Sequence, residues 1–405
     1  MNEENNKTNK KKSGNKPPLI PTIIKVETDL SGLYDFRYNE VKSNIEFRTK
    51  GELEFILLDE KAFNSLWCEL NKKGIACSTS LLINVLKSDF IPVFNPFKEF
   101  FGSLPVWDGE TDYIQLLAET VETTDDDLWH PFFKKWLVAA VGSVINDAVI
   151  NHSAIVLSGP QGIGKTTWLV NLLPKELLQY YYSGTINPNN KDTLGFIAEN
   201  FLVFLDELEN LNRNELGSIK ELITKPAIKF RRPYARTAED MPHRASFAGS
   251  VNHLEFLGDI TGSRRFLCFE VVYINYKHGI DLKNVYAQAL HLYNNDFKYW
   301  FSSEEIDVIN NSNEQFRLRT MEEELLRTYF EPCVMEEADL VLSTTDVALW
   351  FQERKLLTVN AATNKRLGQA LRALSFLRLT KNDRKVYALK EKDLEMVYYN
   401  RKRTA

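Results

Sequence analysis

Residues 159–166 read GPQGIGKT, and this short segment constrains the fold of the chain more than any other. It matches the pattern GxxxxGK[ST], follows the apolar run AIVL at 154–157, and precedes a stretch with helical spacing at 167–173. Glycines at these spacings let the backbone turn its N–H groups inward, where they can surround phosphate oxygens. The sequence therefore predicts a strand, a phosphate-binding loop and a helix in succession.

The side chains that follow the last glycine of this loop supply the other groups that a bound nucleotide needs. We expect Lys165 to reach the β- and γ-phosphates, the Thr166 hydroxyl to bind Mg²⁺, and Thr167 to lie near the α-phosphate. The predicted cofactors are ATP and Mg²⁺. The predicted nucleotide-binding residues are Gly159, Pro160, Gln161, Gly162, Ile163, Gly164, Lys165, Thr166 and Thr167.

A second apolar run, FLVFL at 201–205, leads directly into Asp206 and Glu207. These carboxylates should lie at the carboxyl edge of a sheet, where α/β proteins bind ligands. We expect Asp206 to hold Mg²⁺ through water and Glu207 to orient and deprotonate an attacking water molecule. The alternative is that Glu207 and Glu209 lie at the start of a helix and stabilise its positive end.

Asn252 follows a third apolar run, ASFAG at 245–249. Its amide can both donate and accept hydrogen bonds, so it could bridge the attacking water and the γ-phosphate as a sensor. The alternative is an ordinary turn residue.

Arg264 and Arg265 lie in a polar loop just before the strand expected at 266–272. A guanidinium offered to the γ-phosphate of a neighbouring subunit would stabilise charge in the transition state. The alternative is an intramolecular ion pair with Asp259. The complete set of predicted catalytic residues is Lys165, Asp206, Glu207, Asn252, Arg264 and Arg265.

Buried strands alternate with helical segments between residues 154 and 272, which indicates a covered, largely parallel α/β sheet. The predicted fold class is α/β, with a P-loop NTPase core of the AAA+ type, an α+β N-terminal region and a small C-terminal winged-helix-like module. In the N-terminal region, alternating residues predict strands at 24–28, 34–38 and 44–48, and Asp59 is the expected N-cap of a helix. The predicted domains are a disordered tail at 1–18, the N-terminal region at 19–94, a helical connector at 95–150, an ATPase/helicase domain at 151–300, a helical linker at 301–342 and the winged-helix-like module at 343–405.

Length and composition exclude several other classes of protein. The 405 residues exceed the size of a single hydrophobic core, and the 44% hydrophobic fraction excludes a wholly disordered chain. The longest apolar run, at 136–145, is half of the about 20 residues that a membrane-spanning helix needs. Residues 1–18 are lysine-rich and lack the apolar centre of a secretory signal, so we expect a cytoplasmic protein with no membrane partner. The four cysteines form no CxxC pair, which favours neither a disulfide framework nor a zinc site.

Four segments carry a resemblance to a known family, namely GPQGIGKTTWL, FLDELENLNRNELGSIKELIT, KFRRPYARTAEDMPHR and SVNHLEFLGDITGSRRF. In this order and spacing they resemble the virulence-associated protein E family of phage and mobile-element proteins, which are related to superfamily 3 replicative helicases. The resemblance covers residues 96–272 well and the flanks weakly. It implies an ATP-driven ring, expected to be a homo-oligomer and a hexamer, that translocates on DNA during replication of a mobile element.

Longer members of that family carry a primase domain ahead of this region. The chain before Asn95 is short and shows no acidic cluster suited to binding a metal ion. Priming activity is therefore not predicted, and a separate primase is a candidate partner.

The resemblance also places KFRRPYARTAEDMPHR where related helicases carry a DNA-contacting hairpin in the ring channel. Its basic side chains interleave with aromatic rings, and single-stranded DNA favours this mixture of phosphate-binding charge and stacking surface. The alternative is a structural hairpin with a solvated basic face. The predicted DNA-binding residues here are Lys229, Arg231, Arg232, Tyr234, Arg236 and Arg244.

The C-terminal module is basic, although the whole chain has a net charge of -5. Ser343 and Asp346 have the spacing of a capping box, and a second helix and a hairpin follow, which is the order of a winged helix. Its second helix could enter a major groove of duplex DNA while the hairpin touches the backbone. The alternative is a protein partner. The predicted contacts are Lys365, Arg366, Arg372, Arg384 and Lys385.

These observations favour an ATPase that acts as an oligomeric, ATP-dependent DNA helicase or replication protein of a phage or mobile element. The alternative is an ATP-regulated, origin-binding initiator that does not unwind DNA processively. A small-molecule kinase is the third hypothesis, and the sequence favours it least because a kinase has no need of a water-activating glutamate or a basic C terminus.

Overall fold

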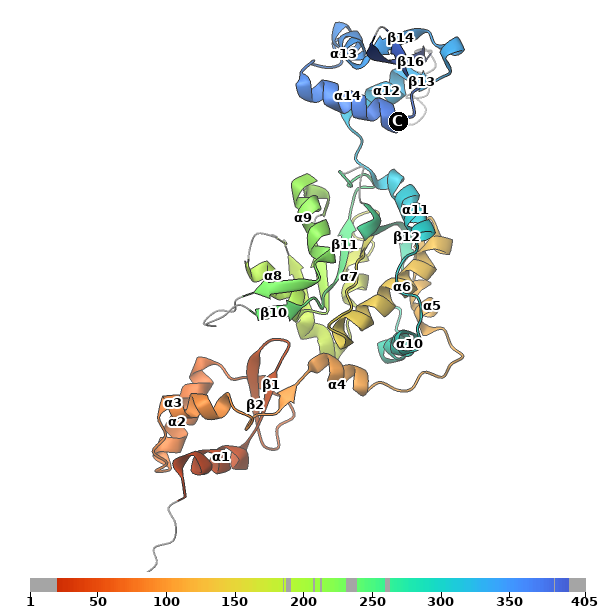
Figure 1. The fold of residues 1–405 in the computed structure, drawn as a ribbon. Coiled ribbons are helices and arrows are strands. Elements are labelled where there is room, and N and C mark those ends of the chain that lie inside the picture. The colour runs from red at the N-terminus through yellow and green to blue at the C-terminus, as the bar shows by residue number, and fades with distance from the viewer. Residues whose placement is uncertain are drawn as a thin grey trace, which may run out of the picture.

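A computed structural model of the chain describes residues 20–184, 186, 191–206, 208–211, 213–230, 239–258, 263–381 and 383–392. The chain forms an N-terminal unit, a central unit and a C-terminal unit that follow one another along the molecule (Figure 1). The central unit is the largest of the three and contains the glycine-rich loop.

The N-terminal unit packs three helices against a four-stranded sheet of order β3-β2-β1-β4. Its elements are α1 (Thr22–Leu33), β1 (Tyr34–Asn39), β2 (Asn44–Thr49), β3 (Ile56–Leu57), α2 (Glu60–Lys72), α3 (Thr79–Leu86) and β4 (Val93–Phe94). Strands β1 and β2 confirm two predicted strands, and Asp59 caps α2 by accepting a hydrogen bond from the Ala62 N–H at 2.7 Å. The strand predicted at 24–28 is wrong, because these residues belong to α1. Val26 and Leu30, one helical turn apart, are its buried face, so the alternation in that short window arises from a helix.

The central unit is built around a six-stranded sheet. Its elements between residues 96 and 210 are α4 (Pro96–Gly102), α5 (Tyr113–Ala118), β5 (Val121–Thr123), α6 (Asp126–Ile145), β6 (Ala154–Ser158), α7 (Lys165–Val170), η1 (Lys175–Tyr180), β7 (Tyr181–Gly184), α8 (Lys191–Glu199), β8 (Leu202–Leu205) and η2 (Leu208–Asn210). They are followed by α9 (Arg213–Thr224), β9 (Ala227–Phe230), β10 (Glu239–Pro242), β11 (Ser246–Val251), η3 (Ser263–Arg265), β12 (Phe266–Ile274), α10 (Leu282–Asn294), α11 (Ser303–Ser312) and η4 (Asn313–Phe316).

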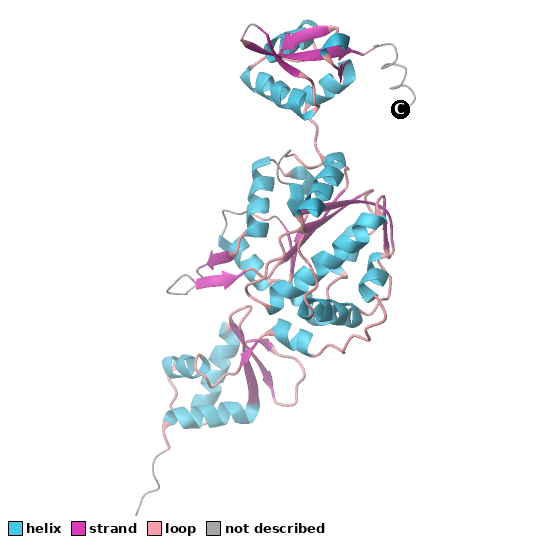
Figure 2. Cartoon of the chain, turned by 45° about the vertical axis from the view of Figure 1, so that its right-hand side comes forward, coloured by secondary structure: helices cyan, strands magenta, loops and turns pink. Residues whose placement is uncertain are grey.

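The strand order of this sheet is β5-β12-β6-β11-β8-β7, and only the edge strand β5 runs antiparallel to its neighbour. Side chains of β6 alternate between two cores. Ile155 and Leu157 pack with α6 and α10, whereas Ala154 and Val156 pack with α8 and α9. Helices therefore cover both faces of the sheet (Figures 1 and 2), which confirms the prediction of a covered, largely parallel α/β sheet.

The C-terminal unit has its own hydrophobic core. Its elements are α12 (Met321–Tyr329), β13 (Phe330–Pro332), η5 (Met335–Glu337), β14 (Leu340–Ser343), α13 (Thr344–Glu353), α14 (Ala361–Ala373), β15 (Arg378–Lys381) and β16 (Arg384–Glu391). Ser343 and Asp346 form the predicted capping box of α13, and β15 pairs with β16 as the predicted hairpin. The core also includes Leu326 and Phe330, so the unit begins ahead of residue 343.

No helix within the described residues is long and apolar enough to cross a membrane. All four cysteines are free thiols, and Cys77 and Cys268 are the two that are buried.

Candidate functional site

The glycine-rich loop connects β6 to α7 and depends on the conformational freedom of its glycines. Gly162 and Gly164 have φ angles of 87° and 101°, in the left-handed region that other residues rarely adopt. A Cβ atom at Gly164 would also overlap the ring of Tyr276, which covers the loop. Any side chain at this position would therefore displace the loop from Tyr276.

Lys165 is folded back onto this loop. Its Nζ donates hydrogen bonds to the carbonyl oxygens of Gly159 at 2.6 Å and Pro160 at 2.8 Å, and it lies 3.4 Å from Oδ1 of Asn252. Only 5% of the residue is exposed, and this burial lowers the pKa of the ammonium group. The loop thus holds a desolvated cation at the end of β6.

Three strands bring the other predicted residues to the same edge of the sheet. Because β6, β8 and β11 are parallel neighbours, the loop after β6, Asp206 after β8 and Asn252 after β11 all follow carboxyl ends. The N–H of Gly159 donates to the carbonyl of Val251 at 3.3 Å, which ties the start of the loop to the end of β11. The sheet therefore gathers Lys165, Asp206 and Asn252 at one edge.

Hydroxyl and carboxylate oxygens line this edge. Oγ1 of Thr166 lies 3.1 Å from Oγ of Ser250, the penultimate residue of β11, and Asp206 is exposed on the far side of that strand. Glu207, the predicted base, lies outside the described residues.

Glu209 also lies at this edge, although its position in the sequence predicted only a helix-terminal carboxylate. Its Oε1 accepts a hydrogen bond from the backbone N–H of Asn252 at 3.3 Å and another from Nδ2 of Asn252 at 3.2 Å. Its charge also opposes the lowering of the pKa of Lys165. In the sequence, only its position just after Asp206 indicates that Glu209 lies at this edge. Its contact with Asn252 joins residues that are 43 positions apart, which no local pattern reveals.

Arg264 and Arg265 lie at the opposite edge of the sheet from Lys165, because they immediately precede β12, which runs parallel to β6. A five-residue strand spans about 16 Å, so neither arginine shares an edge with the glycine-rich loop of its own chain. Burial, and then the positive charge of Arg264, lower the pKa of Arg265, and its Nε is buried with no hydrogen-bond partner among the described residues.

A cavity of about 470 Å³ adjoins the two arginines. His152 also faces this cavity, and burial, followed by the charge of Arg265, lowers its pKa. The described residues that line it are Ala139, Ile150, Asn151, His152, Ser153, Thr224, Arg264, Arg265, Tyr299, Trp300, Phe301 and Ile306. The cavity is therefore cationic and aromatic on its described walls, and no sequence motif marks His152 as part of it.

The basic segment predicted to bind single-stranded DNA is divided by the structure. Lys229 is exposed on β9, whereas Arg231, Arg232, Tyr234 and Arg236 lie outside the described residues. Arg244 is only 6% exposed, and its guanidinium bonds to the carbonyl of Ala198 and to Asp147, each at 3.3 Å. Arg244 thus connects the start of β11 to α8 and to Asp147. Its guanidinium is not exposed to solvent as Lys229 is.

The C-terminal unit exposes most of its predicted DNA-binding residues. Lys365 and Arg372 are exposed on α14, and Arg384 and Lys385 are exposed at the start of β16. Arg366 differs, because its guanidinium forms an ion pair at 2.7 Å with Glu322, which is 2% exposed. This ion pair fastens α14 to α12.

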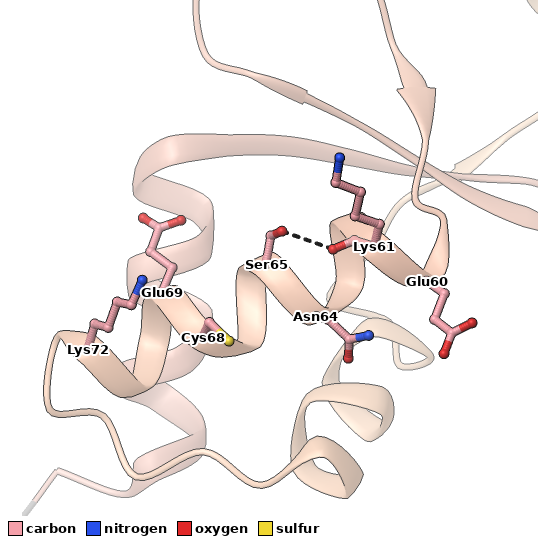
Figure 3. A pocket seen from close by; sticks show the side chains of 7 residues that line it. All are labelled: Glu60, Lys61, Asn64, Ser65, Cys68, Glu69 and Lys72. Carbon is pink, nitrogen blue, oxygen red and sulfur yellow. Dashed lines mark hydrogen bonds between the residues drawn. The ribbon is translucent and has the colours of Figure 1, made fainter.

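Another hollow lies on the outer face of α2, in the N-terminal unit. It is open to solvent, and the Ser65 hydroxyl donates to the Lys61 carbonyl at 2.9 Å along its wall (Figure 3). Its lining residues are Glu60, Lys61, Asn64, Ser65, Cys68, Glu69 and Lys72. All seven belong to one helix of a different unit, so the hollow has no part in the site at the end of β6.

Residues 102–318, more than half of the chain, match the family model of the virulence-associated protein E-like domain. The chain belongs to this family. The matched range contains the glycine-rich loop, Asp206, Glu209, Asn252 and the two arginines, and it ends where the central unit ends. The predicted family is therefore confirmed.

No curated protein sequence matches the chain. Among solved structures, the apo structure of the NrS-1 C-terminal region (305–718) aligns with 92% of this chain and 99% of its own chain, at 13% identity and a TM-score of 0.49. The A form of the apo NrS-1 C-terminal region aligns with 91% of this chain and 98% of its own, at 13% identity and a TM-score of 0.47.

Proposed function

We propose that this family member is a P-loop ATPase of the AAA+ type that works as an oligomeric, ATP-dependent DNA helicase in the replication of a phage or mobile element. The observation that carries the proposal is the convergence of Lys165 and Asn252, 3.4 Å apart, on the sheet edge that also presents Asp206. Membership of the virulence-associated protein E-like family supports the same function.

ATP would enter at the glycine-rich loop. Lys165 Nζ would exchange its bonds to the carbonyls of Gly159 and Pro160 for bonds to the β- and γ-phosphates. The exchange is favourable because a desolvated ammonium gains anionic partners in place of neutral ones.

The oxygen-rich edge suits a magnesium ion. Thr166, beside Ser250, and the exposed carboxylate of Asp206 offer the hard oxygen ligands that Mg²⁺ prefers. Bound with ATP, Mg²⁺ would neutralise charge that develops on the phosphate oxygens.

Hydrolysis would use a water molecule at the γ-phosphate. Its oxygen forms the new bond to the γ-phosphorus as the bond to the bridging oxygen of ADP breaks, and its proton passes to Glu207. Asn252 would orient the water from the end of β11. The products are ADP and inorganic phosphate.

The two arginines favour a shared site. Because Arg264 and Arg265 lie on the edge opposite to their own loop, they would reach the γ-phosphate held by a neighbouring copy of the chain. The expected assembly is a closed homo-oligomer, proposed as a hexamer, in which each site has two contributors.

DNA would be bound at two places. The hairpin of β9 and β10, with Lys229 exposed, would contact a single strand in the ring channel. In the C-terminal unit, α13, α14 and the hairpin of β15 and β16 have the order of a winged helix. Four exposed cations favour duplex binding in this unit, namely Lys365, Arg372, Arg384 and Lys385. They also support the alternative function, an origin-binding initiator.

The first test is ATP hydrolysis with and without single-stranded DNA, measured on protein whose oligomeric mass is determined alongside. We expect an oligomer whose turnover rises with single-stranded DNA. An oligomer that binds one duplex sequence tightly, and whose ATP turnover does not change with single-stranded DNA, would favour the initiator. A chain that neither binds nor hydrolyses ATP would refute both functions.

Glu207→Gln is expected to leave ATP binding intact and to lower hydrolysis by about 10²- to 10⁴-fold, because the amide cannot take the proton of the attacking water. Binding is measured with a fluorescent nucleotide and hydrolysis by phosphate release. Glu221→Gln, on the exposed side of α9, is the matched control and should keep both. Equal loss of binding and hydrolysis in Glu207→Gln would contradict the role of Glu207 as base.

A further inference from the structure

Three side chains form a line of polar contacts at the edge of the sheet where we propose that ATP binds. The carboxylate of Glu209 accepts two hydrogen bonds from Asn252, and Oδ1 of Asn252 lies 3.4 Å from Nζ of Lys165. The line joins η2, the end of β11 and the start of α7, which are distant in sequence. Glu209 therefore forms hydrogen bonds with Asn252, whereas its charge opposes the lowering of the pKa of Lys165 through space.

A glycine in β11 makes this contact possible. A Cβ atom at Gly249 would lie 2.7 Å from Cδ1 of Leu208 and 2.9 Å from the carbonyl of Leu205. Because Gly249 has no side chain, Leu208 packs onto β11 with 0% exposure, and its neighbour Glu209 lies over Asn252. The position of Glu209 is thus set by buried packing and not by an exposed loop.

The two hydrogen bonds also fix which way the amide of Asn252 points. Both its backbone N–H and its Nδ2 donate to the same oxygen, Oε1 of Glu209, so Oδ1 is turned toward Lys165. An asparagine amide without such a partner can rotate and exchange its donor and acceptor. The other carboxylate oxygen, Oε2, is buried and has no hydrogen-bond partner among the described residues.

We propose that Glu209 is a positioning residue, which holds the amide of Asn252 so that its oxygen accepts a hydrogen bond from the attacking water. This inference rests on the proposed function and adds to it a second carboxylate with a role different from that of Glu207. Glu209 takes no proton and touches no phosphate. It acts on the rate of hydrolysis through the orientation of Asn252.

The test compares Glu209→Ala with Glu209→Gln in steady-state ATP hydrolysis and in binding of a fluorescent ATP analogue. Glu209→Ala should lower kcat about tenfold or more, in line with the loss of one preorganised polar group, and change KM and nucleotide affinity by less than about twofold. Glu209→Gln should recover most of kcat, because its amide oxygen can still accept both hydrogen bonds of Asn252. Glu221→Ala, which removes an exposed carboxylate from α9, is the control and should behave as wild type.

A double-variant cycle separates positioning from general damage. Asn252→Ala should lower kcat at least as much as Glu209→Ala, and adding Glu209→Ala to Asn252→Ala should cause no further loss of kcat, because the proposed effect of Glu209 on hydrolysis is the orientation of Asn252. Additive losses, or an unchanged kcat in Glu209→Ala, would overturn the inference and leave the proposed ATPase standing. A wild-type chain without ATP hydrolysis would overturn both, so the two failures are distinguishable.

Discussion

Lys165→Ala is expected to abolish ATP binding and with it all hydrolysis. The ammonium group is buried in the loop and would supply two charge-assisted bonds to phosphate oxygens. Each such bond contributes about 1.5–3 kcal/mol, so losing both weakens binding by a factor of about 100 or more. The measurement is titration with a fluorescent ATP analogue, followed by phosphate release at saturating ATP.

The matched control for this variant is Lys175→Ala. Lys175 is an exposed lysine in η1, ten residues further along the chain, and its removal should leave both measurements unchanged. Circular dichroism should show Lys165→Ala folded, because the substitution removes a desolvated cation and no apolar packing. Retained affinity in a folded Lys165→Ala chain would contradict the assignment of the glycine-rich loop.

Subunits without the finger arginine, tested first as Arg265→Ala, and Lys165→Ala subunits should each be inactive alone and recover activity when mixed. Removing the finger is expected to lower hydrolysis by about 10³- to 10⁵-fold. In a mixed ring, an Arg265→Ala subunit keeps an intact loop and can receive an arginine from a Lys165→Ala neighbour. Random mixing at equal amounts would complete about a quarter of the sites, and phosphate release across a series of ratios measures them.

Arg264→Ala, mixed in the same way, identifies which arginine reaches the neighbouring phosphate. The variant that is inactive alone and rescued in the mixture contains the finger. Mixtures that remain inactive at every ratio, although mass measurement shows that they co-assemble, would contradict a site shared between subunits.

Strong local patterns predicted much of the central unit. The loop at 159–166 and the strands that follow it were recognisable because each is a short apolar run ending in a turn or a polar residue. The N-terminal region was less predictable. Residues 24–28 alternate as a strand would, yet Val26 and Leu30 pack as one face of α1, and a five-residue window cannot distinguish the two periods.

The parts that the sequence could not reveal depend on contacts between distant residues. Arg244 belongs to a run of basic residues, but its guanidinium is buried against Ala198 and Asp147. Arg366 pairs with Glu322, 44 positions away, and Glu209 meets Asn252 only because Gly249 lets η2 approach β11. The amino-acid composition gives the number of charged residues. It does not show which of them already form ion pairs or hydrogen bonds in the folded chain.

Strand β12 has a further consequence in the proposed ring. It begins directly after Arg265, and just beyond its other end the ring of Tyr276 covers Gly164. Within the strand, the carbonyl oxygen of Val271 would lie 3.0 Å from a Cβ atom at Gly159. One continuous strand therefore links the arginines offered to a neighbour with the cover of its own loop. In the proposed ring, a movement of Tyr276 when nucleotide enters would therefore be coupled through β12 to the arginines offered to the next subunit.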